Sequence, residues 1–168
     1  MAIPAIIWHF NVIKNAEGSS IIIINKADMT LSHYNYKGEL LQKSSIATGK
    51  IPGDKKRMGD FKTPEGIFRI IDVEDASDWS HYLKDDTLGK VVGAYGPFFI
   101  RLDVPGQNGI GIHGTVDDSS IGKRASEGCI RMHNAELRQL VNKIGSAKVV
   151  VITPGLTDVA IDSFYNRR

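Results

Sequence analysis

Short runs of alternating or continuous apolar residues occupy most of the chain, and the runs are separated by Gly, Pro, Asn and Asp. Alternation with a period of two is typical of strands that bury one face, and those four residue types are typical of turns. The pattern therefore predicts a mostly β protein. The predicted strands cover residues 20–25, 30–36, 40–47, 66–73, 98–102 and 148–153. Turn residues at 25–28 and 37–38 predict hairpins between the first three strands.

One segment has a helical period instead, so the predicted fold contains one or two short helices. Four apolar residues recur there at i, i+3, i+4 and i+7: Leu137, Leu140, Val141 and Ile144. Asn134 is expected to cap the amino end of this helix and Gly145 to end it. By contrast, residues 75–90 are rich in Asp, Ser and Lys and follow neither period. They predict a surface excursion with short helical turns possible, and long loops of this kind often shape a binding cleft.

The composition is that of one folded domain. Hydrophobic residues make up 42% and charged residues 24% of the chain, far from the composition of disordered chains. The single domain is predicted to span 1–168, with a core over about 19–154 and terminal extensions at 1–18 and 155–168. No apolar stretch is long enough for a membrane span, and the apolar start lacks the basic region and cleavage site of an export signal.

The charge pattern excludes one class of partner. The formal net charge is only +2, and the Lys and Arg residues are scattered among acidic residues. Proteins that bind nucleic acid gather their basic residues into a patch, so nucleic acid is not an expected partner. The oligomeric state cannot be inferred from the sequence.

Cys129 is the only cysteine, which excludes an intrachain disulfide. It follows Ser126, Glu127 and Gly128 and leads into a short apolar run, so it is expected at an exposed turn. A glycine before a nucleophile lets the backbone bend until the N–H groups of Gly128 and Cys129 point at one developing oxyanion. A free cysteine is also commonly a small buried residue, and the local context alone does not separate the two interpretations.

His113 ends a predicted buried strand that begins at Ile110, and a lone histidine in such a place is usually structural. The cysteine changes this interpretation, because a thiol needs a nearby base or cation to ionise at neutral pH. His113 is the natural base, and the carbonyl of Gly114 is the expected group to orient it. Arg131 could favour the thiolate or bind a substrate carboxylate, or it could be a solvated surface residue.

Other chemistry is less well supported. A zinc site would have to combine four scattered side chains: Cys129, His113, His133 and His81. Their spacing lacks a paired ligand element, so neither a metal nor another cofactor is predicted. The glycines at 109, 111 and 114 match a dinucleotide-binding fingerprint, but no convincing helix follows them. Asp117 and Asp118 could form an acid pair, although adjacent acids in a polar loop are usually solvated.

Four ordered motifs give the chain a family resemblance. They are Thr-Gly-Lys at 48–50, Thr-Pro-Glu-Gly-Ile-Phe at 63–68, His-Gly-Thr at 113–115 and Ser-Glu-Gly-Cys-Ile-Arg-Met at 126–132. The sequence resembles the YkuD-type catalytic domain of bacterial L,D-transpeptidases over nearly its whole length. This resemblance implies a β-sandwich or barrel domain that acts in the periplasm or cell envelope without a cofactor.

The resemblance also implies a reaction. A cysteine attacks the bond between a diamino acid and the terminal D-alanine of a peptidoglycan stem peptide, and a thioester forms as D-alanine leaves. An amine from a second stem peptide then resolves the thioester into a cross-link. Water as the acceptor would give an L,D-carboxypeptidase, and a domain that had lost its activity would be a peptidoglycan-binding module. These two alternatives stay open.

The family's roles are carried onto matching residues. Cys129 becomes the nucleophile and His113 the general base, with the Gly114 carbonyl orienting the imidazole. The N–H groups of Gly128 and Cys129 become the oxyanion hole, and Arg131 lies at the substrate site. β-Lactams of the carbapenem type, which mimic the acyl donor, are expected to acylate Cys129.

Ser126 and Glu127 are also placed at the substrate site, and Glu127 departs from the commonest family pattern, which has His in this position. A carboxylate close to the thiol would oppose thiolate formation. Glu127 is therefore expected either to point away from Cys129 or to help position a cationic acceptor amine. The departure concerns the acceptor and the pH optimum more than the reaction class.

Overall fold

The computed structural model describes residues 18–82, 89–145 and 149–155. The strands of its main sheet are β1 (Ser20–Asn25), β2 (Thr30–Asn35), β3 (Leu40–Gly49), β4 (Gly66–Asp75), β7 (Phe98–Asp103), β8 (Gly111–His113), β9 (Arg124–Ser126), β10 (Ile130–Met132) and β11 (Val149–Thr153). All six predicted strands are present and differ from the prediction only at their ends. Residue 148, the first of the last predicted strand, lies outside the described residues, as do most residues of the predicted terminal extensions.

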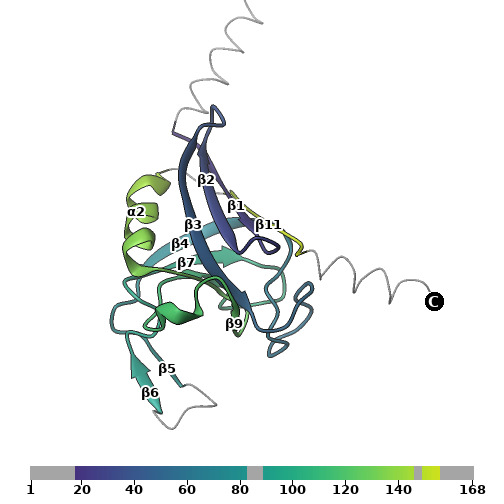
Figure 1. Cartoon of the computed structure of the whole chain (residues 1–168), viewed down its shortest axis with the longest axis vertical. Coiled ribbons are helices and arrows are strands. Elements are labelled where there is room, and N and C mark those ends of the chain that lie inside the picture. Colours follow the sequence, from purple (N-terminus) through teal and green to yellow (C-terminus); the bar gives the residue numbers. More distant parts are fainter. Residues whose placement is uncertain (1–17, 83–88, 146–148, 156–168) are drawn as a thin grey trace, which may run out of the picture.

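The nine strands form one sheet in the order β10-β8-β7-β4-β11-β1-β2-β3-β9 (Figure 1). Strand β10 also pairs with β3, so the sheet closes on itself into a barrel-like structure. Hairpins join β1, β2 and β3, as predicted. The described part of the chain is thus mostly β, which confirms the predicted fold class.

The core lies inside this closed sheet. Because side chains alternate between the two faces of each strand, every second residue of a strand faces the core. Strand β1 is a continuous apolar run, yet only Ile22 and Ile24 are fully buried, while Ile21 and Ile23 face outward and are partly exposed. Residues of the other strands and of the helix complete one hydrophobic cluster. The core needs no disulfide, in agreement with the single cysteine.

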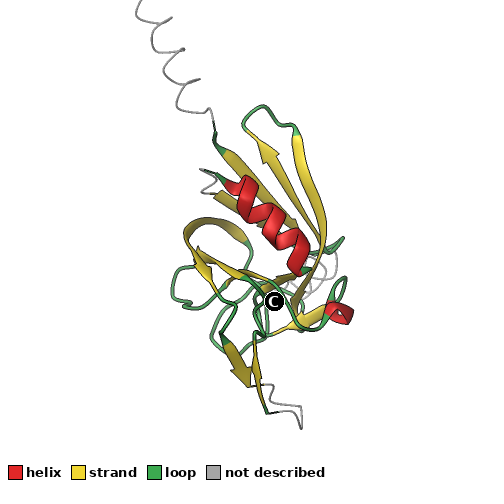
Figure 2. Cartoon of the chain, turned by 90° about the vertical axis from the view of Figure 1, so that its left-hand side faces the viewer, coloured by secondary structure: helices red, strands yellow, loops and turns green. Residues whose placement is uncertain are grey.

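Helix α2 (Asn134–Ile144) packs against β3 and β7 (Figure 2). It buries the predicted apolar stripe, in which Leu137, Leu140 and Ile144 belong to the core and Val141 packs against it. The predicted cap is wrong: His133 is the N-cap residue, and Asn134 is the first helical residue. Instead of capping the helix, the Asn134 side chain accepts a hydrogen bond from the Thr115 N–H at 2.9 Å and so holds the loop after β8.

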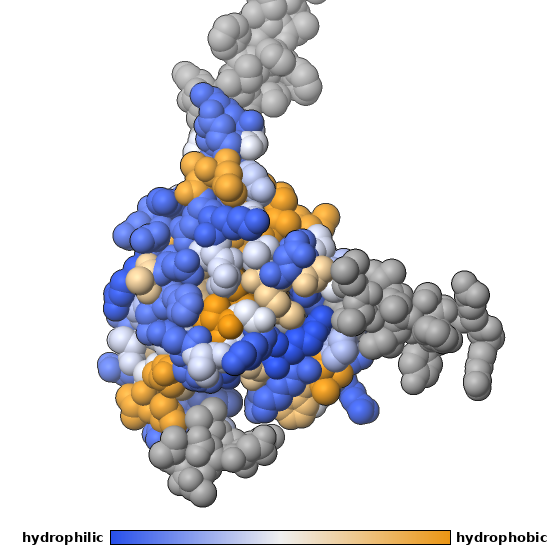
Figure 3. All heavy atoms as spheres, in the orientation of Figure 1, coloured by the Kyte–Doolittle hydropathy of each residue, from blue (hydrophilic) through white to orange (hydrophobic). Residues whose placement is uncertain are grey.

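The surface excursion predicted at 75–90 forms an arm of two strands in its described residues, and residues 83–88 of it lie outside the described residues. Strands β5 (Ser80–Tyr82) and β6 (Lys90–Val92) form a separate two-stranded antiparallel sheet that projects from the end of the barrel (Figure 1). The face of the molecule in Figure 3 is mostly hydrophilic, with several small hydrophobic patches scattered over it. Within the described residues, no helix is long and apolar enough to cross a membrane.

Candidate active site

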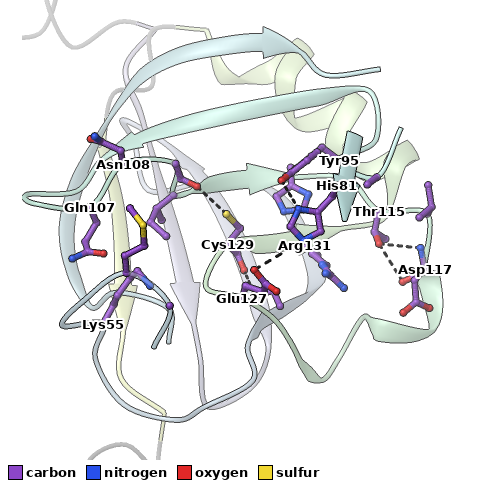
Figure 4. Close-up of a pocket in the computed structure, with 18 residues that line it drawn as sticks. Lys55, His81, Tyr95, Gln107, Asn108, Thr115, Asp117, Glu127, Cys129 and Arg131 are labelled. Atoms are coloured by element: carbon purple, nitrogen blue, oxygen red, sulfur yellow. Dashed lines mark hydrogen bonds and ion pairs between the residues drawn. The ribbon is translucent and has the colours of Figure 1, made fainter. Parts of the chain in front are cut away.

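A cavity of about 340 Å³ opens where the ends of β8 and β10 meet the arm. Both residues that the sequence pairs, Cys129 and His113, line it. Figure 4 shows Cys129 near the middle, with Lys55 and Gln107 to one side of it. His81, from the arm, lies on the opposite side.

Strand register explains why these side chains share a face. Strands β8 and β10 are parallel neighbours, with Ile112 opposite Ile130 and His113 opposite Arg131. The two isoleucines point into the core and are fully buried. Since alternate residues of a strand point to opposite faces, Arg131 and His113 point the other way, and Cys129, two residues before Arg131, does so too. All three therefore line the cavity.

The imidazole of His113 is held in one tautomer. Its Nδ1–H donates to the Gly114 carbonyl at 2.6 Å, which leaves Nε2 as the nitrogen that can accept a proton. The orienting group is the predicted carbonyl. A side chain on Gly114 would collide with the Asn134 side chain, so glycine is required at this close approach.

Aromatic rings surround His113. Its ring stacks on Phe99 with centroids 5.6 Å apart and meets the edge of Tyr95 at 4.9 Å. Burial lowers the pKa of His113 to about 3, and the positive charge of Arg131 adds to this, although the hydrogen bond to Gly114 opposes it. His113 is therefore neutral at pH 7, with the Nε2 lone pair available as a base.

Cys129 is a protonated thiol in the state in which His113 is neutral. Burial raises its pKa, while a hydrogen bond from the Gly111 backbone and the charges of Arg131, Lys55 and Arg101 act in the opposite direction. The thiol donates to the Gly109 carbonyl at 3.3 Å (Figure 4). A neutral thiol and a neutral imidazole that line one cavity suit general-base activation when a substrate is attacked, rather than a preformed ion pair.

The turn before Cys129 depends on Gly128. Its φ is 137°, and a Cβ there would come within 2.8 Å of the Lys62 carbonyl oxygen, so only glycine fits. The Gly128 N–H donates to Ser126 Oγ at 3.1 Å, and the Ser126 hydroxyl donates to the Cys129 carbonyl. The Gly128 N–H and the Ser126 hydroxyl thus both have partners within the turn. The predicted oxyanion role of Gly128 and the predicted substrate contact of Ser126 stay predictions.

Lys55 lies on the cavity wall with its charge paired. Its Nζ is 2.9 Å from Asp60 Oδ1. Burial works to raise the pKa of Asp60, but the hydrogen bonds from Lys55 and from three backbone N–H groups hold this pKa well below its ordinary value. Asp60 is therefore a carboxylate at neutral pH, and the positive charge of Lys55 acts to lower the pKa of Cys129.

The adjacent acids Asp117 and Asp118 do not act together. Asp117 accepts hydrogen bonds from the N–H and hydroxyl of Ser119 and caps the short 3-10 helix η1 (Asp118–Ser120). Asp118 binds the His133 ring at 2.9 Å. Across residues 18–82, 89–145 and 149–155, no group of three or more His, Cys, Asp or Glu side chains could hold a metal ion.

Comparison with known proteins shows which family the chain belongs to. The family model described as "YkuD: L,D-transpeptidase catalytic domain" matches residues 19–152, which is most of the chain. The chain belongs to this family.

Two relatives of this L,D-transpeptidase domain are Bacillus proteins. The YkuD protein of Bacillus licheniformis is 42% identical over 133 residues, which cover 79% of this chain and 65% of the relative. The YqjB protein of Bacillus subtilis is 37% identical over 111 residues, which cover 65% of this chain and 57% of the relative. The chain therefore matches about three fifths of the length of these relatives.

Solved L,D-transpeptidase structures share the fold. The helical cell shape determining protein Pgp2 of Campylobacter jejuni superposes with a TM-score of 0.58 at 28% identity, over 81% of this chain and 48% of that one. The catalytic domain of an E. faecium L,D-transpeptidase gives a TM-score of 0.57 at 19% identity, over 79% of this chain and 95% of that one.

The structure also gives functions to motif residues of this L,D-transpeptidase domain that the sequence left without a role. The buried Thr63 hydroxyl donates to the Gly128 carbonyl at 2.9 Å and accepts from the Gly49 N–H at 2.8 Å. It thereby joins the end of β3 to the turn before Cys129. Its own carbonyl is held by the buried Lys26 ammonium, which also binds Glu65 Oε1 at 2.6 Å.

Proposed function

We propose that this chain is the catalytic domain of a peptidoglycan L,D-transpeptidase in which Cys129 is the nucleophile and His113 is the general base. One observation supports this most strongly. The thiol and the imidazole line one cavity, and the bond from His113 Nδ1–H to the Gly114 carbonyl leaves Nε2 as the base. The stem peptides of peptidoglycan, and hence the cell envelope, are the proposed substrate and site of action.

The proposed acylation begins with proton transfer. The Cys129 thiol gives its proton to His113 Nε2, and the sulfur attacks the carbonyl carbon between the diamino acid and the terminal D-alanine. The Cys129 N–H and the nearby positive charges of Lys55 and Arg131 stabilise the negative charge that develops on the carbonyl oxygen. The C–N bond then breaks, D-alanine takes the proton from His113, and a thioester remains.

Transfer reverses these roles. An amine from a second stem peptide attacks the thioester carbon, and its proton passes through His113 to the departing sulfur. The new C–N bond is the cross-link. Arg131, which is two residues from the nucleophile and opposite His113, is placed to bind a carboxylate of the donor.

Product analysis with a defined tetrapeptide muropeptide tests the proposal. Release of D-alanine together with muropeptide dimers is the expected result. Trimmed monomers without dimers would mean that water is the acceptor, as in an L,D-carboxypeptidase. Unchanged muropeptide bound to the protein would mean a binding module and would contradict the proposal.

A further inference from the structure

The Glu127 side chain is turned toward the arm. Its Oε2 lies 4.0 Å from His81 Nε2, and both side chains are partly exposed to the cavity. The dashed line between Glu127 and His81 in Figure 4 crosses the space beside Cys129. Glu127 is therefore next to the place where a thioester on Cys129 would be attacked.

The separation of 4.0 Å is too long for a hydrogen bond between the two groups. The Glu127 carboxylate and the His81 imidazole therefore do not hydrogen-bond to each other directly. The separation does allow a third group placed between them to contact both. Two acceptors at this separation can each lie about 2.9 Å from a single nitrogen placed between them. A protonated amine fits this space, because it carries a positive charge and several N–H donors.

Tyr95 sets which His81 nitrogen faces Glu127. The Tyr95 hydroxyl lies 3.1 Å from His81 Nδ1. When Nδ1–H donates to this hydroxyl, Nε2 carries the lone pair and can accept a proton from an amine. The ring of His81 is further fixed by its edge contact with the Tyr95 ring at 5.8 Å.

The cavity presents charges of both signs around Cys129. On one side stand Lys55, Gln107 and Asn108, and on the other stand His81, Tyr95 and Arg131, with Glu127 below the sulfur (Figure 4). An acyl donor that ends in a carboxylate suits the two cations, Lys55 and Arg131. An ammonium group suits the Glu127 carboxylate, so the two substrates of a transfer reaction would bind to different groups around Cys129.

We propose that Glu127 and His81 form the subsite for the protonated amine of the acceptor, an inference that rests on the proposed transpeptidase function. The carboxylate binds the ammonium group, and His81 Nε2 takes one proton from it. The neutral amine then attacks the thioester, the C–N bond forms and the C–S bond breaks. The second amine proton passes through His113 to the sulfur, and His81 later releases its proton to water.

The test compares acceptors of different charge on the same acyl-enzyme. A tetrapeptide that ends in D-alanine forms the thioester, whose intact mass is followed over time. Nα-acetyl-L-lysine amide is the cationic acceptor, and hydroxylamine, which is neutral at pH 7, is the uncharged one. Glu127→Gln and His81→Gln are compared with Glu39→Gln, the same change as the first at an exposed turn residue that does not line the cavity.

Glu127→Gln is expected to lower kcat/KM for the lysine derivative at least about tenfold, the loss expected for one charge-assisted contact. Reaction with hydroxylamine, hydrolysis and acylation should change less than about twofold, and Glu39→Gln should change nothing. Equal losses with both acceptors, or no loss with the lysine derivative, would overturn the subsite. A wild-type protein that forms no thioester at all would instead overturn the proposed function, and the subsite with it.

Discussion

The cavity has a sheet wall, made of Cys129, Arg131 and His113, and an arm wall, made of His81 and Tyr95. The sheet wall is built on strands that pair with neighbours on both sides, since β8 lies between β7 and β10. The arm strands β5 and β6 pair only with each other. His113 is 4% exposed, whereas the His81 side chain is 31% exposed.

The difference separates two tasks. Groups that activate the nucleophile and protonate the leaving group must be held within a few tenths of an ångström, and a closed sheet holds them so. A two-stranded sheet by itself is marginally stable, which suits groups that bind the acceptor amine and take its first proton before the attack. Variants of the sheet wall should therefore affect the reaction more than variants of the arm wall.

The largest effect is expected from Cys129→Ala. Acyl-enzyme formation and D-alanine release should fall at least about 10³-fold, because no other thiol exists in the chain to form the thioester. Rapid-quench mass spectrometry and D-alanine assays measure both. Activity comparable to wild type, in a variant with an unchanged thermal midpoint, would contradict the role of the sheet wall.

His113→Gln should slow acylation about 10²–10⁴-fold, the range for loss of a general base. The thiol should remain present, so a small alkylating reagent should still label it at high pH. Single-turnover acylation by a carbapenem measures the loss. An acylation rate within a few-fold of wild type would show that another group takes the thiol proton.

His113 should also make stability depend on pH. Its pKa falls from 6.5 to about 3 on folding, so between these values the unfolded chain binds more protons than the native one. The free energy of unfolding should therefore fall as the pH falls from about 6.5 toward about 3, by up to about 1.4 kcal/mol per pH unit. Above this range the residue contributes no slope.

Urea unfolding at several pH values tests this dependence. Burial lowers the pKa of His33 as well, so the wild-type slope contains a second contribution of the same sign. The informative quantity is the difference between wild type and His113→Gln, in which the slope should be shallower. Identical slopes would contradict the buried, neutral imidazole.

Thr63→Val tests the support behind the sheet wall. The change removes the hydrogen bonds to Gly128 and Gly49 and should lower the free energy of unfolding by about 1–3 kcal/mol. Acylation should slow about tenfold as the turn before Cys129 loosens. Thr63→Ser keeps the hydroxyl and should retain most of the stability and most of the acylation rate. Equal losses in the two variants would show that packing of the side chain, rather than its hydrogen bonds, is responsible.

Tyr95→Phe should have the smallest effect. It removes one hydrogen bond on the arm wall, to His81, and should change the free energy of unfolding by about 1 kcal/mol or less. Carbapenem acylation should change less than about threefold. A loss as large as that of Thr63→Val would show that the arm is as important for the reaction as the sheet.

The sequence predicts the sheet wall better than the arm wall for a physical reason. Strand alternation and the glycines next to Cys129 and His113 are local features, so the face of each side chain and the orienting carbonyl of Gly114 could be predicted from neighbouring residues. The place of His81 depends on how a long excursion returns to the barrel. The sequence offered His81 only as a zinc ligand, and nothing local indicated its position beside Glu127.

Two buried polar contacts could not be predicted from the sequence for the same reason. Lys26 lies in a segment typical of an exposed turn, yet it is 1% exposed and binds carbonyls of Gly53 and Thr63. The use of the Gly128 N–H by Ser126 depends on the rotamer of one hydroxyl. Composition and periodicity do not encode such partners, since they are set only when distant loops meet.

The most direct test of the central claim is the mass of the protein after rapid mixing with a tetrapeptide that ends in D-alanine, followed by peptide mapping. The account predicts an adduct equal to the peptide without its D-alanine, located on Cys129 and slow to form in His113→Gln. An adduct elsewhere in the chain, or D-alanine release without a covalent intermediate, would contradict it.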